Sequence, residues 1–376
     1  MNPKKLGFGL MRLPLKDPAR LDSIDYDALC QMVDEYMDAG FSYFDTAVPY
    51  HARRNSEIAF RECVSKRYPR SSYTITNKLS FSMIKREDEL EDFFADQLEC
   101  CGVEYFDYYL LHAMKSEYIE LADRIHAYDF IRRKMDEGRI RHIGFSFHDT
   151  ADVLDGYLAK HPEMEYVQLQ INYADWDSFE VQSRLCYETA VKHSKRVLVM
   201  EPVKGGLLVN LPEKGLKALR DADPDASPAS WALRFAASLG NVDMVLSGMS
   251  SLEQIRDNIR TMSEFRPLSD QERLAIDKAA QAIKEKESIG CTACCYCVES
   301  CPRKIGIPYY FKLMNDISKF GESQRKRAEN RYKYYTESEG RGKASSCVKC
   351  GKCEEQCPQH LPIRKLLEDT AKELEK

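Results

Sequence analysis

The sequence predicts an α/β protein whose main part is a (β/α)8 TIM barrel, followed by a small α-helical domain rich in cysteine. Two observations carry this prediction. Apolar runs and helix-like segments alternate through most of the chain, and eight cysteines gather in two groups near its end. A length of 376 residues exceeds the usual single domain, so a large barrel with an appended domain fits. We expect the barrel over residues 1–284 and the second domain over residues 285–376.

The strand candidates are short apolar runs, and each is followed by a segment with helical periodicity. In the first such segment Leu29, Val33 and Tyr36 share one face, and Gly40 marks the helix end. An open, doubly wound sheet has the same alternation and is the alternative fold. Strands are expected near residues 6–10, 43–46, 73–78, 106–112, 140–146, 166–172, 197–200 and 242–247, and helices near 26–39, 57–68, 88–101, 128–138, 151–160, 179–192 and 228–239.

The charge and the apolar content give no reason to expect nucleic acid or membrane as a partner. Lysine and arginine number 55 against 60 acidic residues, so no strong positive field would attract a polyanion. No apolar run approaches the roughly 20 residues of a membrane span. The first residues, Met1 to Lys5, are not followed by the apolar core of a signal peptide. We therefore expect a cytoplasmic protein.

Polar side chains that could take part in acid–base chemistry lie at or just after the ends of three neighbouring strand candidates. Asp45 ends the strand near residue 43 and Tyr50 follows it in a loop, while Lys78 and His112 end the next two strands. In a barrel the carboxyl ends of the strands form the face that carries active sites. Each residue singly has a structural explanation, such as an aspartate that caps a loop. Together they predict one polar site.

These residues resemble a known family. Phe44-Asp45-Thr46-Ala47, Tyr50, Lys78 and Leu110-Leu111-His112 match, in order and spacing, the signature of the aldo/keto reductases. The resemblance covers about residues 1–284, and its four spaced residues make it specific. It implies a barrel enzyme that reduces a small-molecule carbonyl, or oxidises an alcohol, with a nicotinamide nucleotide.

The resemblance also implies a role for each of the four residues. Tyr50 would protonate the carbonyl oxygen while hydride arrives from the nicotinamide. A phenol with a pKa near 10 is a poor acid at neutral pH, and Lys78 would lower that pKa. Asp45 would hold Lys78 charged, and His112 would orient the carbonyl oxygen.

The expected nucleotide contacts also follow from the resemblance. Ser146 and Gln168 would hold the nicotinamide carboxamide, with Asn172 as a neighbour that shares the work. Gly205 and Gly206 would approach the pyrophosphate.

The adenosine end of the nucleotide would lie at a helix start near residue 252, where free amides favour an anion. Asn258 would meet the adenine. Members selective for the 2′-phosphate carry lysine and arginine where this chain has Gly248 and Gln254. The choice between NADH and NADPH therefore stays open.

Fourteen cysteines include two runs with the same spacing, C-x2-C-x2-C-x3-C-P. This is the spacing of bacterial two-cluster ferredoxins, in which the fourth cysteine of each run ligates the other cluster. An all-thiolate zinc site is the alternative. The expected ferredoxin-like domain would hold one 4Fe–4S cluster on Cys291, Cys294, Cys297 and Cys357, and another on Cys347, Cys350, Cys353 and Cys301.

Three functions fit these features. The barrel could reduce a carbonyl with clusters that are structural or redox-sensing. The clusters could instead exchange single electrons with the barrel and with a ferredoxin or flavin partner, since hydride carries two electrons and clusters pass one. The protein could also be a non-catalytic electron-transfer module, which the complete set of Asp45, Tyr50, Lys78 and His112 argues against. The basic tract Arg325-Lys326-Arg327 could dock an acidic electron carrier or be a solvated helix face.

Overall fold

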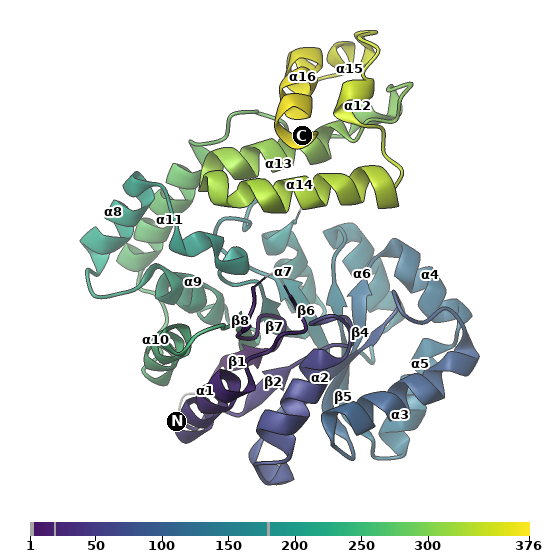
Figure 1. The fold of residues 1–376 in the computed structure, drawn as a ribbon, viewed down its shortest axis with the longest axis vertical. Helices are drawn as coiled ribbons and strands as arrows, with labels where there is room; N and C mark the ends of the chain where they lie inside the picture. The colour runs from purple at the N-terminus through teal and green to yellow at the C-terminus, as the bar shows by residue number, and fades with distance from the viewer. Residues whose placement is uncertain (1–3, 19, 179–180) are drawn as a thin grey trace. The chain divides into compact units, whose positions relative to one another are not determined.

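Eight parallel strands close a barrel in chain order in the computed structural model, which describes residues 4–18, 20–178 and 181–376 (Figure 1). The barrel is closed by the pairing of β8 with β1, in which Gly7 lies opposite Leu246. The predicted barrel is therefore confirmed, and the open sheet is excluded. The strands are β1 Leu6–Gly9, β2 Tyr43–Asp45, β3 Thr74–Ser80, β4 Phe106–Met114, β5 Ile140–Phe147, β6 Tyr166–Gln170, β7 Arg196–Met200 and β8 Val242–Gly248.

Helices connect the strands (Figure 1). The sequence missed α4, which precedes α5 between β4 and β5. The helices up to residue 284 are α1 Tyr26–Asp38, α2 Asn55–Phe60, α3 Leu90–Cys101, α4 Ser116–Arg124, α5 Ala127–Asp136, α6 Ala151–Lys160, α7 Ser183–Lys192, α8 Glu213–Ala222, α9 Pro228–Ala237, α10 Leu252–Ser263 and α11 Asp270–Lys284.

Several element ends differ from the predicted ones. β3 continues two residues past Lys78, because its ladder with β4 extends to the pair Ser80 and His112. β4 continues two residues past His112, where Met114 pairs with Phe147 of β5. β6 ends at Gln170, so Asn172 lies beyond the strand. The predicted helix at 57–68 is α2 followed by a π-helical turn, Arg61–Ser65. Residues 179–180, at the expected start of the next helix, lie outside the described residues.

An aromatic cluster fixes β1 and β2 beneath the candidate site. Tyr36 of α1 packs between Phe8, Phe41 and Phe44 at ring-centroid distances of 5.4 to 5.6 Å. Each such pair contributes about 1 kcal/mol beyond its buried area. The Tyr36 hydroxyl lies 2.7 Å from the carbonyl oxygen of Leu6, so its burial leaves no polar atom unsatisfied. This packing holds the strand that ends at Asp45.

The chain divides into two compact units. One unit consists of residues up to Val209 together with Ala226–Arg273, and the other of Asn210–Asp225 together with Leu274–Lys376. Helix α8 thus groups with the C-terminal residues, where Gly215 lies against Ala279 of α11. The domain boundary expected after residue 284 stays a prediction.

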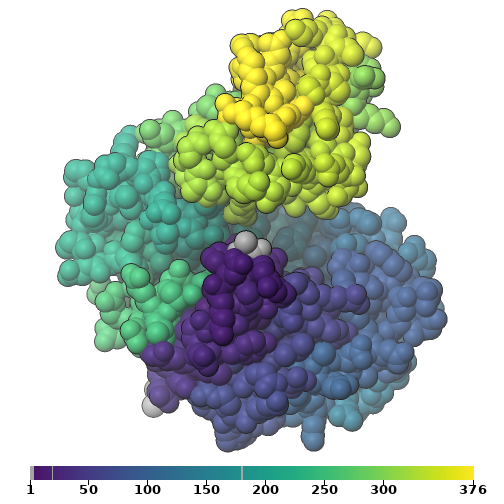
Figure 2. Space-filling view, viewed as in Figure 1, coloured from purple at the N-terminus to yellow at the C-terminus, as the bar shows by residue number. Residues whose placement is uncertain are grey.

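The C-terminal residues pack around a small apolar core of their own, built mainly by α13 Ile307–Phe320, α14 Arg325–Lys333 and α16 Ile363–Leu374. Figure 2 shows the outer surface of these residues in yellow-green and yellow. Tyr310 and Phe311 are fully buried in this core. Asn315 of α13 accepts hydrogen bonds from the amides of Ser288 and Ile289, which fixes the segment that leads to Cys291. The helices after residue 284 are α12 Tyr296–Glu299, α13 Ile307–Phe320, α14 Arg325–Lys333, α15 Lys352–Glu355 and α16 Ile363–Leu374.

The two cysteine runs have the same backbone conformation. Each has left-handed residues at the same three positions, two just before a one-turn helix, α12 Tyr296–Glu299 or α15 Lys352–Glu355, and one after it. In the first run φ is 52° at Ala293, 63° at Cys295 and 50° at Lys304. At the matching positions of the second run φ is 57° at Lys349, 83° at Gly351 and 50° at His360. The repeated spacing is therefore a structural repeat as well.

None of the helices among the described residues is both long enough and apolar enough to cross a membrane.

Candidate active site and metal centre

The carboxyl ends of β2, β3 and β4 bring the four candidate catalytic residues together. The Nζ atom of Lys78 lies 2.5 Å from Oδ1 of Asp45 and donates to the carbonyl oxygen of Thr46 at 2.8 Å. The same Nζ lies 5.4 Å from the centre of the Tyr50 ring. The rings of Tyr50 and His112 approach edge to face, with centroids 6.2 Å apart. Lys78 and Asp45 are buried, while Tyr50 and His112 are half-buried.

Burial and charge set the protonation of this group. Burial raises the pKa of the Tyr50 phenol above its usual value, and the Lys78 charge only partly offsets that rise. The lowering of this pKa that was expected from Lys78 is therefore outweighed by burial. Burial lowers the pKa of Lys78, but the charges of Asp45 and Tyr50 outweigh it and raise this pKa above its usual value. Burial and the Lys78 charge hold the pKa of His112 well below its usual range. At neutral pH the site thus contains an ammonium ion and a neutral imidazole.

Ser80 joins the site and was missed by the sequence analysis. Its hydroxyl oxygen lies 2.8 Å from Nδ1 of His112. When the Ser80 hydroxyl donates to Nδ1, the single ring proton of the neutral imidazole lies on Nε2. Ser80 lies two residues after Lys78 in the same strand, so strand alternation puts both side chains on one face. That alternation is the signal that would have found it.

Two of the predicted nucleotide contacts adjoin the four residues. Gln168 of β6 donates from Nε2 to Oδ2 of Asp45 at 3.0 Å, and both side chains are buried. Ser146 of β5 accepts a hydrogen bond from the amide of Ala113, the residue after His112, at 2.7 Å.

Asn172 contributes to a separate buried ion pair. Its Nδ2 atom donates to Asp175 at 2.9 Å, and Asp175 lies 2.5 Å from Nζ of Lys204. Gly205 and Gly206 come next, with left-handed φ angles of 65° and 93° that favour glycine. A side chain at Gly206 would meet nothing within 4 Å, so the backbone is open at that point.

The remaining predicted contacts gather where β8 leads into α10. Asn258 donates to Ser247 at 2.9 Å, and Gln254 accepts from the amide of Ser250 at 2.8 Å. The side chain of Arg12 lies close to Gly248, since a Cβ at that glycine would stand 3.1 Å from it. Arg12 is an exposed cation that the sequence analysis did not consider.

Two cavities in the C-terminal unit are lined by cysteines from both runs. Cys301 lies with Cys347, Cys350 and Cys353 in the lining of one cavity. Cys357 lies with Cys291, Cys294 and Cys297 in the lining of the other. The fourth cysteine of each run thus lies with three cysteines of the other run, as the predicted ligand sets require.

The thiols suit a cluster better than a single ion. Each set surrounds a cavity with apolar walls, including Ile307 in both cases and Phe311 in the second. Within residues 4–18, 20–178 and 181–376, no three side chains of His, Cys, Asp or Glu converge closely enough to bind one metal ion. A cube of iron and sulfide holds its four thiolates farther apart than a single zinc ion does. Cys295, which belongs to neither predicted ligand set, also lines the second cavity.

Comparison with known families identifies both parts of the chain. A model described as the aldo/keto reductase family matches residues 5–281, well over half of the chain. A model described as a 4Fe-4S dicluster domain matches residues 290–362. The chain belongs to the aldo/keto reductase family. It is an NAD(P)-dependent oxidoreductase that carries a 4Fe-4S dicluster domain.

Two curated relatives show more distant likeness. An aldo-keto reductase of Mycolicibacterium smegmatis is 30% identical over 142 residues, which are 38% of this chain and 45% of that protein. The chain thus matches less than half of that relative. The uncharacterized oxidoreductase YqkF of Bacillus subtilis is 23% identical over 274 residues, which are 64% of this chain and 84% of that protein.

Solved structures share the barrel fold. Aldo-keto reductase AKR11C1 from Bacillus halodurans, in its holo form, gives a TM-score of 0.58 at 23% identity, over 74% of this chain and 92% of that chain. The aldo-keto reductase from Klebsiella pneumoniae in complex with NADPH gives 0.56 at 17% identity, over 73% and 90%. At these identities the likeness shows the fold alone.

Proposed function

We propose that the barrel reduces a carbonyl compound, or oxidises the corresponding alcohol, with Tyr50 as the proton donor and acceptor. The observation that carries the proposal is the buried pair of Lys78 and Asp45, whose ammonium group lies 5.4 Å from the Tyr50 ring centre. A bound nicotinamide nucleotide supplies or accepts the hydride. As the carbonyl oxygen becomes an alkoxide, the Tyr50 hydroxyl gives it a proton, and the phenolate that forms is stabilised by Lys78.

The other two residues support that proton transfer. Asp45 keeps Lys78 protonated in a site where burial would otherwise favour the neutral amine. His112 is neutral and bound to Ser80 through Nδ1, so a proton on Nε2 can be donated to the carbonyl oxygen. A neutral donor polarises the carbonyl without competing with Tyr50 for the proton transfer.

The nucleotide would bind along the strand ends that carry the predicted contacts. Ser146 and Gln168 lie beside His112 and Asp45, where the carboxamide of a nicotinamide would be held. Open space at the α-carbon of Gly206 would let a pyrophosphate approach the backbone of Gly205 and Gly206. The Klebsiella pneumoniae enzyme binds NADPH. Arg12 beside Gly248 offers a cation for a 2′-phosphate and thus a basis for NADPH preference.

We further propose that the C-terminal unit holds two 4Fe–4S clusters on the predicted ligand sets. Each cavity is lined by the four thiols of one predicted ligand set, with Cys295 as a fifth thiol in the second cavity. Ile307 of the small apolar core lines both cavities. Bound clusters would supply one-electron transfer, and an acidic ferredoxin or a flavin would be the partner that exchanges those electrons.

Replacing Tyr50 by Phe tests the first proposal. The variant removes one hydroxyl and is expected to lose carbonyl reduction by at least about 100-fold, the usual contribution of a positioned general acid. Nucleotide binding and cluster absorbance should be unchanged. Carbonyl reduction at the normal rate in this variant would overturn the assignment.

A further inference from the structure

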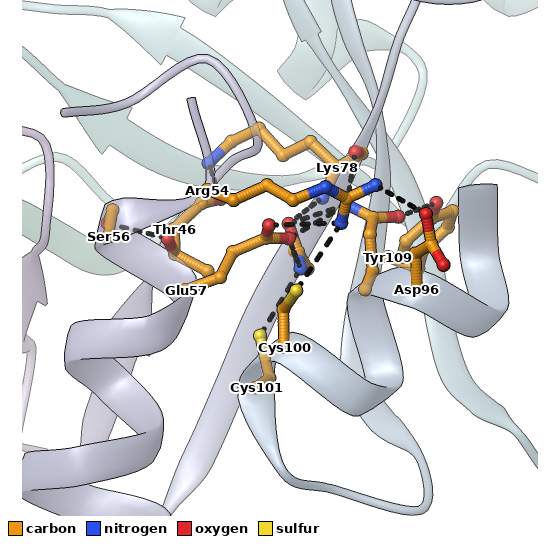
Figure 3. A network of polar contacts seen from close by, with 11 residues as sticks. Thr46, Arg54, Ser56, Glu57, Lys78, Asp96, Cys100, Cys101 and Tyr109 are labelled. Carbon is orange, nitrogen blue, oxygen red and sulfur yellow. Dashed lines mark hydrogen bonds and ion pairs between the residues drawn. The ribbon is translucent and has the colours of Figure 1, made fainter. Parts of the chain in front are cut away.

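A buried carboxylate lies directly behind the candidate catalytic lysine. Glu57 of α2 has no solvent-exposed surface, and the sequence analysis gave it no role. Its Oε1 atom accepts hydrogen bonds from Nδ2 of Asn77 at 2.7 Å and from Nε2 of Gln97 at 3.3 Å. Its Oε2 atom lies 3.5 Å from the guanidinium of Arg54, which also pairs with Asp96 at the surface (Figure 3). Polar groups of α2, α3, β3 and β4 thus meet around one carboxylate.

The two amides that Glu57 binds hold the main chain of Lys78. Strand β2 ends at Asp45 opposite Thr76, so β3 has no partner on that side beyond Thr76. Side chains take over the hydrogen bonds there. The amide of Lys78 donates to Oδ1 of Asn77 at 2.8 Å, and its carbonyl oxygen accepts from Nε2 of Gln97 at 3.0 Å. The hydroxyl of Tyr109 donates to Oε1 of Gln97 at 2.5 Å.

The chemistry of a carboxylate explains why an acid stands at this point. A side-chain amide has one donor end and one acceptor end and can bind either way round, whereas an ionised carboxylate only accepts. When Glu57 is ionised, it therefore requires the NH2 groups of Asn77 and Gln97 to face it. This orientation turns Oδ1 of Asn77 towards the amide of Lys78, and it leaves Oε1 of Gln97 for Tyr109.

We propose that Glu57 is a positioning residue for Lys78, acting through the side-chain amides of Asn77 and Gln97. Lys78 reaches Tyr50 and Asp45 from the inner face of the barrel, while Glu57 holds its main chain from the helix layer outside. The inference rests on the proposed role of Lys78 in proton transfer. A shift of about 1 Å in a catalytic group can lower a rate by about 100-fold, so a fixed main chain matters.

A second buried carboxylate, near the other end of β3, provides a matched control. Asp107 of β4 accepts from the amide of Ile75 at 3.0 Å, three residues before Lys78. It pairs with Arg70, as Glu57 pairs with Arg54, and also with Arg141 of β5. None of these three partners of Asp107 is Lys78 or an amide that binds Lys78. Loss of Asp107 should therefore weaken the fold without moving Lys78.

The test compares Glu57→Leu, Glu57→Gln and Asp107→Asn in the full-length protein with its clusters intact. Glu57→Leu should lower kcat for carbonyl reduction by about 100-fold with little change in KM. It should also move the alkaline limb of the pH profile upwards, because a displaced Lys78 stabilises the Tyr50 phenolate less. Glu57→Gln keeps an acceptor oxygen and should recover most of the rate. Asp107→Asn should lower the melting temperature and leave kcat and the pH profile unchanged.

Hydrogen exchange of the peptide that contains Lys78 gives a readout that needs no substrate. The amide of Lys78 should exchange faster in Glu57→Leu and at the wild-type rate in Asp107→Asn. If Glu57→Leu does not fold, Gln97→Met removes the bond to the Lys78 carbonyl oxygen and should give the same kinetic pattern. Unchanged exchange and an unchanged pH profile in these variants would overturn the inference. Full activity in Tyr50→Phe would instead overturn the proposed function, and the exchange measurement would still decide the role of Glu57.

Discussion

The pair of Lys78 and Asp45 is the residue-scale feature on which the proposed chemistry depends. An ion pair that is buried on all sides is rarely kept for stability alone, because desolvation of the two charges offsets most of their attraction. Here one charge faces a phenol that must lose and regain a proton. The arrangement is what acid catalysis by a tyrosine requires at neutral pH.

Removing one partner of this pair should separate its two roles. Lys78→Met is expected to abolish carbonyl reduction and to lower the free energy of unfolding by about 3 to 5 kcal/mol, because Asp45 is left as an unpaired buried charge. The double variant Lys78→Met with Asp45→Asn should recover much of that stability and none of the activity. Denaturant unfolding and initial rates measure the two quantities. Equal instability of the single and double variants would contradict this account of the pair.

Protonation of Glu57 should make the free energy of unfolding depend on pH. Burial raises its pKa from 4.5 to about 7. Between pH 4.5 and about 7 the Glu57 carboxyl group is protonated in the folded state and ionised in the unfolded state. The stabilisation from this bound proton is therefore complete below pH 4.5 and is lost as the pH rises through about 7. The difference corresponds to roughly 3 kcal/mol. The unfolding free energy of Glu57→Gln should fall less over this pH range than that of the wild type, and parallel curves would contradict the prediction.

At the scale of elements, the barrel strands were predictable and their ends were not. Each strand could be recognised from the apolar or alternating pattern of its own residues. The alternation of these strands with helices predicted the barrel, and the structure confirms that it is closed. The extension of β3 to Ser80 depends on pairing with β4, a contact between residues far apart in sequence. The network around Glu57 escaped detection for the same reason. Its members come from four elements, and only the folded chain brings them together.

Ser80 lies beside His112 only because β3 extends two residues past Lys78, so the prediction for Ser80 tests the extent of this strand. Ser80→Ala should lower kcat by about tenfold, since the imidazole loses the contact that fixes its ring and tautomer. Replacement by Thr keeps the hydroxyl and should retain more activity than Ala. Steady-state kinetics with one carbonyl substrate measures both. A Thr variant as slow as the Ala variant would point to packing rather than to the hydrogen bond.

At the scale of the whole molecule, the chain joins two kinds of redox chemistry. The barrel belongs to a family of oxidoreductases, and a 4Fe-4S dicluster domain follows it. A nicotinamide nucleotide carries electrons as a pair in hydride, whereas a 4Fe–4S cluster passes single electrons. The cysteine spacing predicted the crossed ligand sets, and the two cavities have the matching linings. The substrate could not be predicted, because pocket shape depends on the loops after the strands rather than on any motif.

Paired cysteine variants test the crossed ligand sets through iron content. If Cys357 belongs with the first run, Cys291→Ser with Cys357→Ser damages one cluster and should keep about half of the iron. Cys347→Ser with Cys357→Ser then damages both clusters and should lose nearly all of it. Anaerobic iron analysis measures the result. The reverse pattern would mean that each run binds its own cluster.

The central claim is that Tyr50 and Lys78 make the barrel a nicotinamide-dependent carbonyl reductase. The most direct test mixes the anaerobic protein, with oxidised clusters, with NADH or NADPH and a panel of carbonyl compounds, and follows nucleotide oxidation and cluster absorbance together. We predict that one nucleotide is consumed per carbonyl reduced, that the clusters stay oxidised without an added flavin, and that Tyr50→Phe stops the reaction. Bleaching of the clusters by the nucleotide alone, equally in wild type and Tyr50→Phe, would contradict the account and make the clusters the entry point of the electrons.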